Sequence, residues 1–469
     1  MNRREFIGMT AAAAATLAVG GARRARASAS RPNILLVVSD DWGWPYYSFM
    51  QPEVGPCFGA AIPTCDLQQD PNCQPYRFPL GRTPTLDALA AGGICFPLGL
   101  STAPKSAWAR QSIQTGLNRR DLPHDGTFYI HREDDIPAKL AAGGRVTIPL
   151  ALGGLGYKTY GLGKWEVDGA LLSNFFNVNQ PGSGAETIQN TNLHGPDLFR
   201  SFLDGPGQRP EPWFVMFAPE IPHSPYIAGA TYDFHAFEQP SPTTCGDKPV
   251  GLSDTNLQRF LNSCTWVDTM VGDIVNELDL RGIRNDTIVM YTADHGAALA
   301  RGKANFTENG LRTPIIANCP APVGTPWRIP ARGLHPALAG TIDIMPTILD
   351  YAREGQSSIP SWVPDPLDAV RFPDALSFRA VASGTTDDLR TEMFSNRDLG
   401  GDKSVRQATY DSGTGALTSL WKLYVSKTNR EKALYDLLAN PFENPKQNLV
   451  RNPAQAARIA ALKQAIAAW

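Results

Sequence analysis

Several short segments of the chain carry residue types that suit a divalent cation and an anionic ester. Asp40-Asp41 and Asp294-His295 each offer adjacent oxygen or nitrogen ligands. An isolated Asp-Asp pair is usually a solvated turn, but a second pair of possible ligands, Asp294-His295, after another strand favours a shared metal site. The residues that could bind an ester or transfer a proton are Ser106, Arg110, Lys164, His223 and Lys303.

Strand-like, mostly apolar runs precede three of these segments, and the first of them is rich in β-branched residues. Residues 34–38 run into Asp40-Asp41, residues 213–217 precede Pro222-His223, and residues 287–291 precede Asp294-His295. Such runs are typical of buried parallel strands, and open α/β sheets bind ligands at the carboxyl ends of their strands. Because neighbouring residues on a regular strand face opposite sides, Asp40 and Asp41 reach one cation only where the strand gives way to a loop.

Helical patterns lie between the strands, at residues 85–91, 106–115 and 257–280. Alternating strands and helices predict an α/β fold with a large, mostly parallel central sheet flanked by helices. The length of 469 residues and the hydrophobic content of 42% allow a large core. We therefore expect an ordered catalytic domain over residues 28–365.

Two regions depart from this alternation. Residues 45–82 are rich in proline, glycine and cysteine, which predicts an insertion, and we place it near the mouth of the site. From about residue 359 the chain becomes proline-rich, then shows a strand pattern at 420–425 and an alanine-rich helix pattern at 454–469. These features predict a small C-terminal α+β subdomain over residues 366–469.

The N-terminus resembles an export signal of the twin-arginine (Tat) type. Arg3-Arg4 precede a small-residue apolar run at 9–20, and Ala25-Arg26-Ala27 offers a cleavage site. The run is shorter than the ~20 residues of a spanning helix. We expect residues 1–27 to be removed after export by the Tat machinery, which would leave a periplasmic or secreted protein.

Charge and cysteine content exclude other classes. The net charge is −2, and removing residues 1–27 would lower it to −6, which argues against a nucleic-acid partner. In an oxidising compartment some of the seven cysteines could pair, leaving at least one unpaired. None has the C-x-x-C spacing of a structural zinc site.

Together these segments resemble the sulfatase family of the alkaline-phosphatase superfamily, from residue 32 to about 449 without the insertion. Residues 106–110, Ser-Ala-Trp-Ala-Arg, followed by Thr115-Gly116, resemble the family's nucleophile segment. Further matches are Gly163-Lys164-Trp165, Pro222-His223-Ser224-Pro225, and the spacing of Lys303, Glu308, Arg312 and Pro314. The resemblance implies an alkaline-phosphatase-like fold and a sulfuric ester hydrolase.

The resemblance also assigns roles. Asp40, Asp41, Asp294 and His295 would hold calcium, and manganese is the alternative because His295 supplies nitrogen. Ser106 would be oxidised to formylglycine by a maturase and act as the nucleophile at a helix N-terminus. Arg110 would hold this side chain, Lys164 and Lys303 would bind sulfate, and His223 or Lys303 would protonate the leaving oxygen. The substrate would be a small-molecule or glycan sulfate ester.

Two positions depart from the family pattern. Trp108 stands where the maturation signal has proline or alanine, and Glu166 stands where relatives carry histidine. An alternative is therefore a phosphomonoester, phosphodiester or phosphonate hydrolase that uses unmodified Ser106. A third is an inactive sulfatase-like binding protein. Ser106 could also serve only as a helix N-cap, and Glu308 and Arg312 could form a helix-surface pair.

Overall fold

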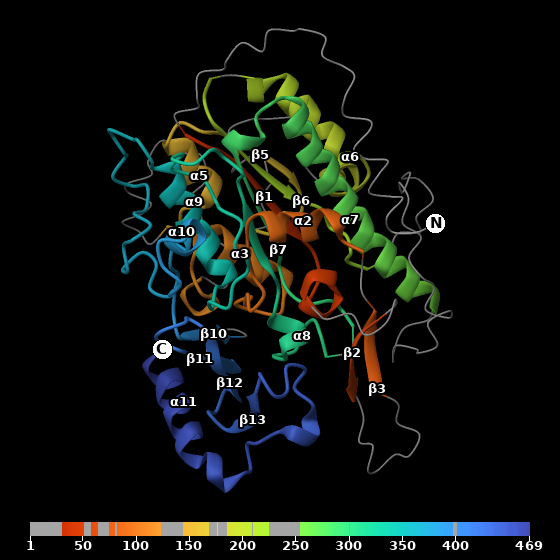
Figure 1. Cartoon of the computed structure of the whole chain (residues 1–469), viewed down its shortest axis with the longest axis vertical. Helices are drawn as coiled ribbons and strands as arrows, with labels where there is room; N and C mark the ends of the chain where they lie inside the picture. The colour runs from red at the N-terminus through yellow and green to blue at the C-terminus, as the bar shows by residue number, and fades with distance from the viewer. Residues whose placement is uncertain are drawn as a thin grey trace. The chain divides into compact units, whose positions relative to one another are not determined.

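Seven strands form the central sheet of this computed structural model (Figure 1). The structure describes residues 31–50, 58–63, 75–79, 82–122, 144–167, 176, 185–208, 210–224, 254–299, 301–396 and 401–469. The strand order is β5-β6-β1-β7-β8-β4-β9. Their bounds are β1 Asn33–Ser39, β4 Ile94–Phe96, β5 Lys158–Gly163, β6 Trp213–Ala218, β7 Thr287–Ala293, β8 Ile315–Asn318 and β9 Gly333–Leu334.

Four adjacent strands of this sheet are parallel. β1 lies between β6 and β7 and pairs in parallel with both, and β5 adds in parallel beyond β6. β8 runs antiparallel to β7, so the sheet is mixed on that side. The carboxyl ends of β5, β6, β1 and β7 consequently meet at one edge, as the three strand-then-polar segments predicted.

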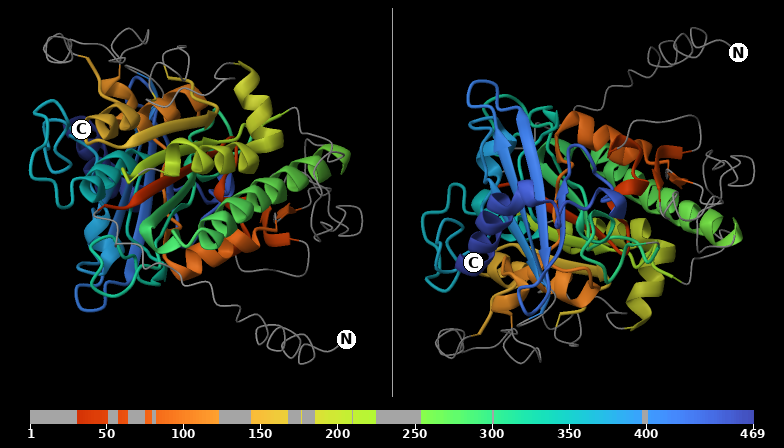
Figure 2. Two further views of the ribbon diagram at one scale, coloured as in Figure 1. Left: turned by 90° about the horizontal axis from the view of Figure 1, so that it is seen from above. Right: turned by 90° about the horizontal axis from the view of Figure 1, so that it is seen from below.

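Helices cover both faces of the sheet, with α2, α6 and α7 on one face and α3, α5, α9 and α10 on the other (Figures 1 and 2). Short α8 follows β7. The bounds are α2 Pro84–Gly92, α3 Ser106–Thr115, α5 Ile148–Gly154, α6 Ala185–Asp204, α7 Asp254–Leu280, α8 Glu308–Leu311, α9 Ile344–Ala352, α10 Arg379–Ser383 and α11 Ala456–Ala468.

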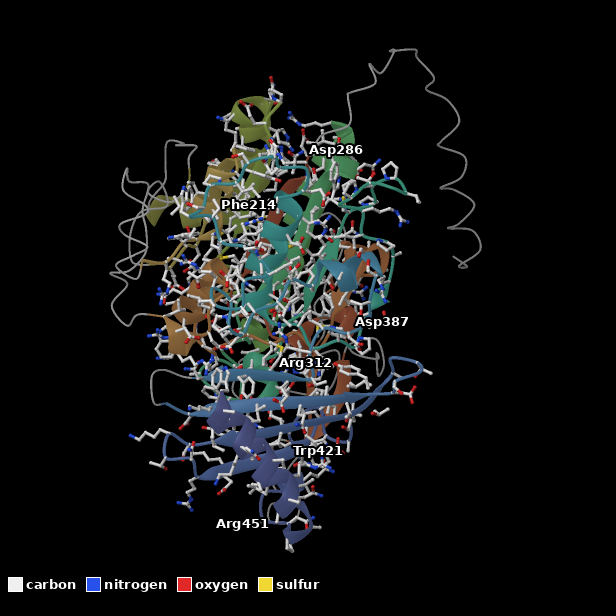
Figure 3. All side chains as sticks on the ribbon, turned by 90° about the vertical axis from the view of Figure 1, so that its left-hand side faces the viewer. Phe214, Asp286, Arg312, Asp387, Trp421 and Arg451 are labelled. Carbon is white, nitrogen blue, oxygen red and sulfur yellow. The ribbon has the colours of Figure 1, made fainter. Side chains whose placement is uncertain are left out.

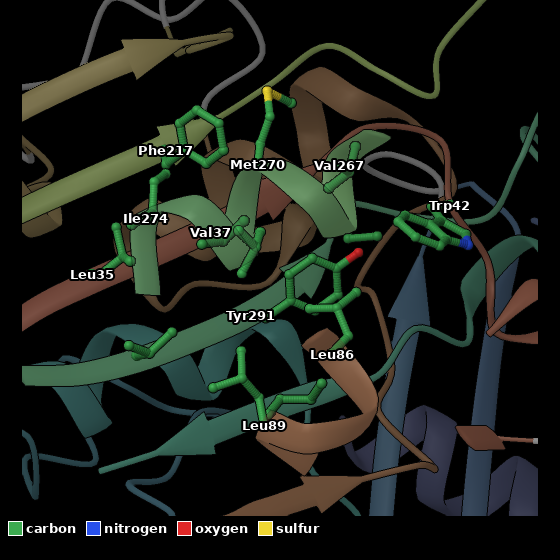
Figure 4. Close-up of a cluster of buried hydrophobic side chains, with 14 of the residues drawn as sticks. Leu35, Val37, Trp42, Leu86, Leu89, Phe217, Val267, Met270, Ile274 and Tyr291 are labelled. Atoms are coloured by element: carbon green, nitrogen blue, oxygen red, sulfur yellow. The ribbon is translucent and has the colours of Figure 1, made fainter. Parts of the chain in front are cut away.

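Alternate residues of β1 build the core beneath α7. Leu35 and Val37 are fully buried and belong to the same apolar cluster as Val267, Met270 and Ile274 of α7 (Figure 4). Because side chains alternate across a strand, the residues between them face the opposite helical layer. Burial on both faces explains why β1 is apolar throughout and why its first polar side chains come at its end.

A second, antiparallel sheet forms near the C-terminus. Its strands are β10 Glu392–Asn396, β11 Lys403–Tyr410, β12 Leu417–Val425 and β13 Glu431–Asp436, in sequence order. Leu462 and Ile466 of α11 pack on it together with Trp421, which Figure 3 labels in β12. The predicted fold class, a mostly parallel α/β sheet with a small C-terminal α+β part, is confirmed, whereas the boundary at 365/366 stays a prediction.

The predicted insertion contains regular structure where it is described. Short 3₁₀ turns lie at Trp44–Tyr46 and Ser48–Met50, and β2 Phe58–Pro63 pairs with β3 Pro75–Pro79 as a hairpin. Its place at the site mouth stays a prediction. The signal-like residues 1–27 lie outside the described residues. Within the described part, no helix is both long and apolar enough to span a membrane.

Three cysteines can be assessed. Cys95, Cys264 and Cys319 are buried free thiols. The other four, Cys57, Cys65, Cys73 and Cys245, lie outside the described residues, so the predicted pairing stays a prediction.

Candidate active site

Four side chains that could hold a metal ion converge at the carboxyl edge of the central sheet. Asp40 and Asp41 follow β1, and Asp294 and His295 follow β7. One ligand atom from each of the four lies within 4.8 Å of the others, and all four residues are buried. The parallel pairing of β1 with β7 brings the two pairs together, since Ser39 and Ala293 end these strands in register.

The end of β1 turns both aspartates toward the same place. Asp41 has a φ of +60°, a left-handed conformation that is uncommon outside glycine. Its backbone N–H donates to Asp294 Oδ1 (3.1 Å), which also accepts from His295 N (2.8 Å). The strand therefore ends abruptly at this pair, as two adjacent ligands of one cation require.

The electrostatics of these residues suit a cation. Burial and the neighbouring Asp294 raise the pKa of Asp40 well above its usual range. Burial also opposes the charge of Asp294, but His295 and Arg110 outweigh it and hold that pKa below its usual value. Three buried carboxylates and one imidazole fit a divalent ion, with oxygen ligands that suit calcium and a nitrogen that admits manganese.

Ser106 is the first residue of α3 and faces this cluster. Its Oγ lies 3.2 Å from Asp40 Oδ1 and 3.0 Å from His295 Nε2. Lys105 occupies the N-cap position of α3, and no side chain caps the helix there. The interpretation of Ser106 as only an N-cap is therefore wrong, because its hydroxyl bonds to two of the four candidate metal ligands.

Three cations surround the carboxylates. Lys164, after β5, donates to Asp40 Oδ2 at 2.5 Å, and Lys303 donates to Asp41 Oδ1 at 2.8 Å. Arg110 is fully buried one turn into α3 and donates to Asp294 Oδ2 (3.2 Å) and to the Lys164 carbonyl (3.1 Å). Burial opposes the charge of Lys164, but Asp40 outweighs it and raises the lysine pKa.

His223 completes the group from the loop after β6. Its Nδ1 lies 2.5 Å from the Ser224 carbonyl, so Nδ1 carries the proton, and its Nε2 lies 3.7 Å from Asp41 Oδ2. The side chain is 26% exposed, close to the 27% of Lys303. The structure therefore brings all nine residues expected from the sequence into one site, with His223 and Lys303 on its open side.

Sequence and structural comparisons agree with this geometry. The family model described as Sulfatase matches residues 32–354. This chain belongs to the sulfatase family. It is 24% identical over 289 residues to a choline-sulfatase of Rhizobium meliloti (strain 1021), covering 56% of this chain and 51% of that protein. It is 23% identical over 392 residues to arylsulfatase A of Bos taurus, covering 70% and 65%.

The chain thus spans less than two thirds of the length of either relative. A solved structure from work on glycosaminoglycan metabolism by Bacteroides thetaiotaomicron superposes with a TM-score of 0.60 at 18% identity. That superposition covers 92% of this chain and 94% of the other. At this identity the likeness shows the fold, which is that of sulfatase structures.

The first departure from the sulfatase pattern, Trp108, is the third residue of α3. Its ring lies under Lys105 Nζ (4.6 Å to the centroid) and Arg119 Cζ (5.2 Å). Cations over an indole face are attracted by its quadrupole. The half-buried Trp108 ring thus contacts two basic side chains of the folded sulfatase domain.

The second departure, Glu166, lies inside the site. Its Oε1 is 3.3 Å from Lys164 Nζ and its Oε2 is 3.9 Å from Arg110 Nε. Glu220, which the sequence interpretation missed, lies with Oε1 4.0 Å from Lys164 Nζ. Glu220 could have been identified from the same pattern as His223, because it is also a polar residue that follows the apolar run of β6. Asp40, Glu220 and His223 also form a second group of potential ligands within 4.8 Å.

The expected surface pair between Glu308 and Arg312 is wrong. Glu308 is buried and accepts hydrogen bonds from Arg406 (2.6 Å to Oε2) and Lys422 (3.1 Å to Oε1). Lys422 also pairs with Glu443 at 2.9 Å. Arg312 instead donates to the Pro97 carbonyl and stacks on Trp44. Glu308 therefore joins the Lys303 segment to β11 and β12.

Proposed function

We propose that this sulfatase-family chain hydrolyses a sulfate ester at this site, with Ser106 as the nucleophile. The observation that carries the proposal is the position of Ser106 Oγ, 3.2 Å from Asp40 and 3.0 Å from His295. A hydroxyl at a helix N-terminus, beside candidate metal ligands and surrounded by three cations, suits an attack on an anionic ester.

Asp40, Asp41, Asp294 and His295 would hold the divalent ion, for which calcium is the first choice and manganese the second. The bound ion would act as a Lewis acid and offset negative charge on the transferred group. Lys164 and Lys303 extend that compensation, because their ammonium groups lie within 3 Å of the ligand carboxylates. Arg110 holds Asp294 and the backbone of Lys164 in place through hydrogen bonds to the Asp294 carboxylate and the Lys164 carbonyl.

Proton delivery to the leaving oxygen falls to His223 or Lys303. Both are partly exposed and lie on the open side of the site, where the alcohol part of an ester would leave. A positioned acid of this kind typically contributes about 10²–10⁴-fold to the rate. As the S–O bond breaks, its electron pair stays on the leaving oxygen, which takes the proton.

We further propose that Ser106 is converted to formylglycine, on the resemblance of residues 106–116 to the family's nucleophile segment. A hydrated aldehyde supplies a second hydroxyl, whose deprotonation re-forms the aldehyde and expels sulfate. A sulfated small molecule or glycan is the proposed substrate, in line with the choline-sulfatase and arylsulfatase names of the relatives. Tat export to the periplasm stays part of this proposal and rests on the N-terminal sequence.

The decisive experiment is mass spectrometry of the peptide that contains Ser106, from protein purified from the native host. Formylglycine is lighter than serine by the mass of two hydrogens and reacts with a hydrazide label. Ser106→Ala is the matched control for both the label and turnover. An aldehyde together with hydrolysis of sulfate esters supports the proposal, whereas unmodified serine without sulfate turnover overturns it.

One observation favours phosphoester hydrolysis by unmodified Ser106 as the second candidate. His295 Nδ1 donates to the Gly296 carbonyl (2.9 Å), so its Nε2, which lies 3.0 Å from Ser106 Oγ, is the ring nitrogen that can accept the serine proton when no ion is bound to it. Turnover of phosphomonoesters, phosphodiesters or phosphonates by serine-form protein would support this candidate. Tight binding of a sulfated sugar without any turnover would instead support the inactive binding protein.

A further inference from the structure

We infer that Glu166 and Glu220 set the charge selectivity of the anion site, so that it favours monoanionic esters over dianionic ones. This inference rests on the proposed function, because it concerns the group that lies next to Ser106. Sulfate monoesters carry one negative charge near the reacting atom, whereas phosphate monoesters carry two at neutral pH.

Glu166 contacts both cations on the closed side of the site. Its two carboxylate oxygens lie 3.3 Å from Lys164 Nζ and 3.9 Å from Arg110 Nε. Oε2 is buried, and no group in the described part of the chain donates a hydrogen bond to it. The Glu166 carboxylate therefore places a negative charge beside Lys164 and Arg110.

The backbone holds Glu166 in this position. Lys164 N donates to the Ala218 carbonyl (2.7 Å), and the Lys164 carbonyl accepts from Arg110 (3.1 Å). Trp165 is buried against Phe176, with ring centroids 5.2 Å apart. Glu166 itself has a φ of +50°. Because the preceding residues are anchored, the carboxylate stays beside Lys164 when an anion enters.

The charge balance shows the consequence. Five carboxylates, Asp40, Asp41, Glu166, Glu220 and Asp294, interact with three cations, Lys164, Lys303 and Arg110. These eight side chains together carry a net charge of −2, which one divalent ion brings to zero. Without Glu166 and Glu220 the loaded site would carry +2 and would favour a dianion.

The size of the effect follows from Coulomb's law. Removing one negative charge at about 4 Å changes the energy of a monoanion by about 1 kcal/mol in a water-like environment, which is about fivefold in affinity. For a dianion in the same place the energy doubles, so the factor is about 25-fold. The ratio of the two affinities should therefore change by about fivefold.

The test compares binding of sulfate and sulfamate to calcium-loaded protein by calorimetry at pH 8. These tetrahedral ions have nearly the same shape, but sulfate carries two negative charges and sulfamate one. Glu166→Gln should bind sulfate about 25-fold and sulfamate about fivefold more tightly than wild type. Glu211→Gln is the matched control, since exposed Glu211 precedes the opposite end of β6 and changes the net charge equally.

Equal changes for both ions, or no change, would overturn the inference. If Glu166→Gln fails to fold, Glu220→Gln is measured in the same way and should shift the ratio in the same direction. Wild-type protein that binds neither ion would count against the proposed function as well. Wild type that hydrolyses sulfate esters while the variant keeps the wild-type ratio would overturn this inference alone.

Discussion

Replacing Glu308 by glutamine should destabilise the protein far more than a surface charge change would. Glu308, Arg406 and Lys422 have side chains about 1% exposed, and the carboxylate accepts from Arg406 Nε (2.9 Å), Arg406 Nη2 (2.6 Å) and Lys422 Nζ (3.1 Å). Removing one partner of a buried ion pair typically costs about 3–5 kcal/mol, because the other charge stays buried. Glu443 still faces Lys422, so we expect a loss near the lower end.

The measurement is chemical denaturation followed by tryptophan fluorescence, with Glu431→Gln as the control. Glu431 pairs with Lys463 at a site where both side chains are about a third exposed, so its loss should cost under about 1 kcal/mol. Both changes remove one negative charge from the chain. A Glu308 variant no less stable than the Glu431 variant would refute the reasoning.

The pH dependence gives a second check on Glu308. Burial opposes its charge, but Arg406 and Lys422 outweigh it and lower its pKa below the usual value. A lowered pKa contributes stability that is present above the ordinary glutamate pKa and is lost as the pH falls through the lowered value. The difference between wild type and Glu308→Gln should therefore shrink in acid, and a difference that grows in acid would contradict the assignment.

Three further predictions concern the metal, the leaving group and a buried acid. Dialysis against a chelator should abolish turnover and lower thermal stability, and calcium at about 100 times its Kd should restore both, with about 2.7 kcal/mol of stability; unchanged melting would argue against the metal site. Lys303→Met should slow the hydrolysis of esters with poor leaving groups by about 10²–10⁴-fold and that of activated aryl esters much less. An equal loss of rate for both kinds of ester would argue against proton donation by Lys303. Burial raises the pKa of Asp268 to about 7, although its carboxylate accepts from Leu86 N and Thr85 N at the start of α2. A raised pKa contributes stability that is full below the ordinary aspartate pKa and is lost as the pH rises toward 7, by up to about 4 kcal/mol. The stability of Asp268→Asn relative to wild type should therefore rise between about pH 4 and 8. A difference in the free energy of unfolding that stays constant over this range would contradict the raised pKa.

Local sequence patterns were enough to predict the elements that position the site. β1, β6 and β7 are buried on both faces, so each appears in the sequence as an apolar run that ends at its first functional residue. The three helices expected at residues 85–91, 106–115 and 257–280 appear as α2, α3 and α7 with ends shifted by three residues or fewer. Periodicity is a local property, which is why it sufficed here.

Charge pairing could not be predicted in the same way. Glu308 and Arg312 are spaced as a helical pair, yet α8 ends at Leu311 and Glu308 turns to Arg406, which is 98 residues away in sequence. Glu220 escaped notice because a single acid in a loop has no periodic signal. Ion pairs of this kind depend on which strands meet in space, and the sequence pattern within one element does not contain that information.

The C-terminal sheet therefore takes part in shaping the site. Asn396 N donates to the Thr102 carbonyl (3.1 Å), which ties β10 to the loop that leads into Ser106. Ala304 N donates to the Pro104 carbonyl (2.8 Å), which ties the Lys303 loop to the same loop. The buried pair of Glu308 with Arg406 joins the segment after Lys303 to β11. These hydrogen bonds connect the loops of both Ser106 and Lys303 to the C-terminal sheet. A displacement of this sheet would therefore move the proposed nucleophile and the proposed acid together.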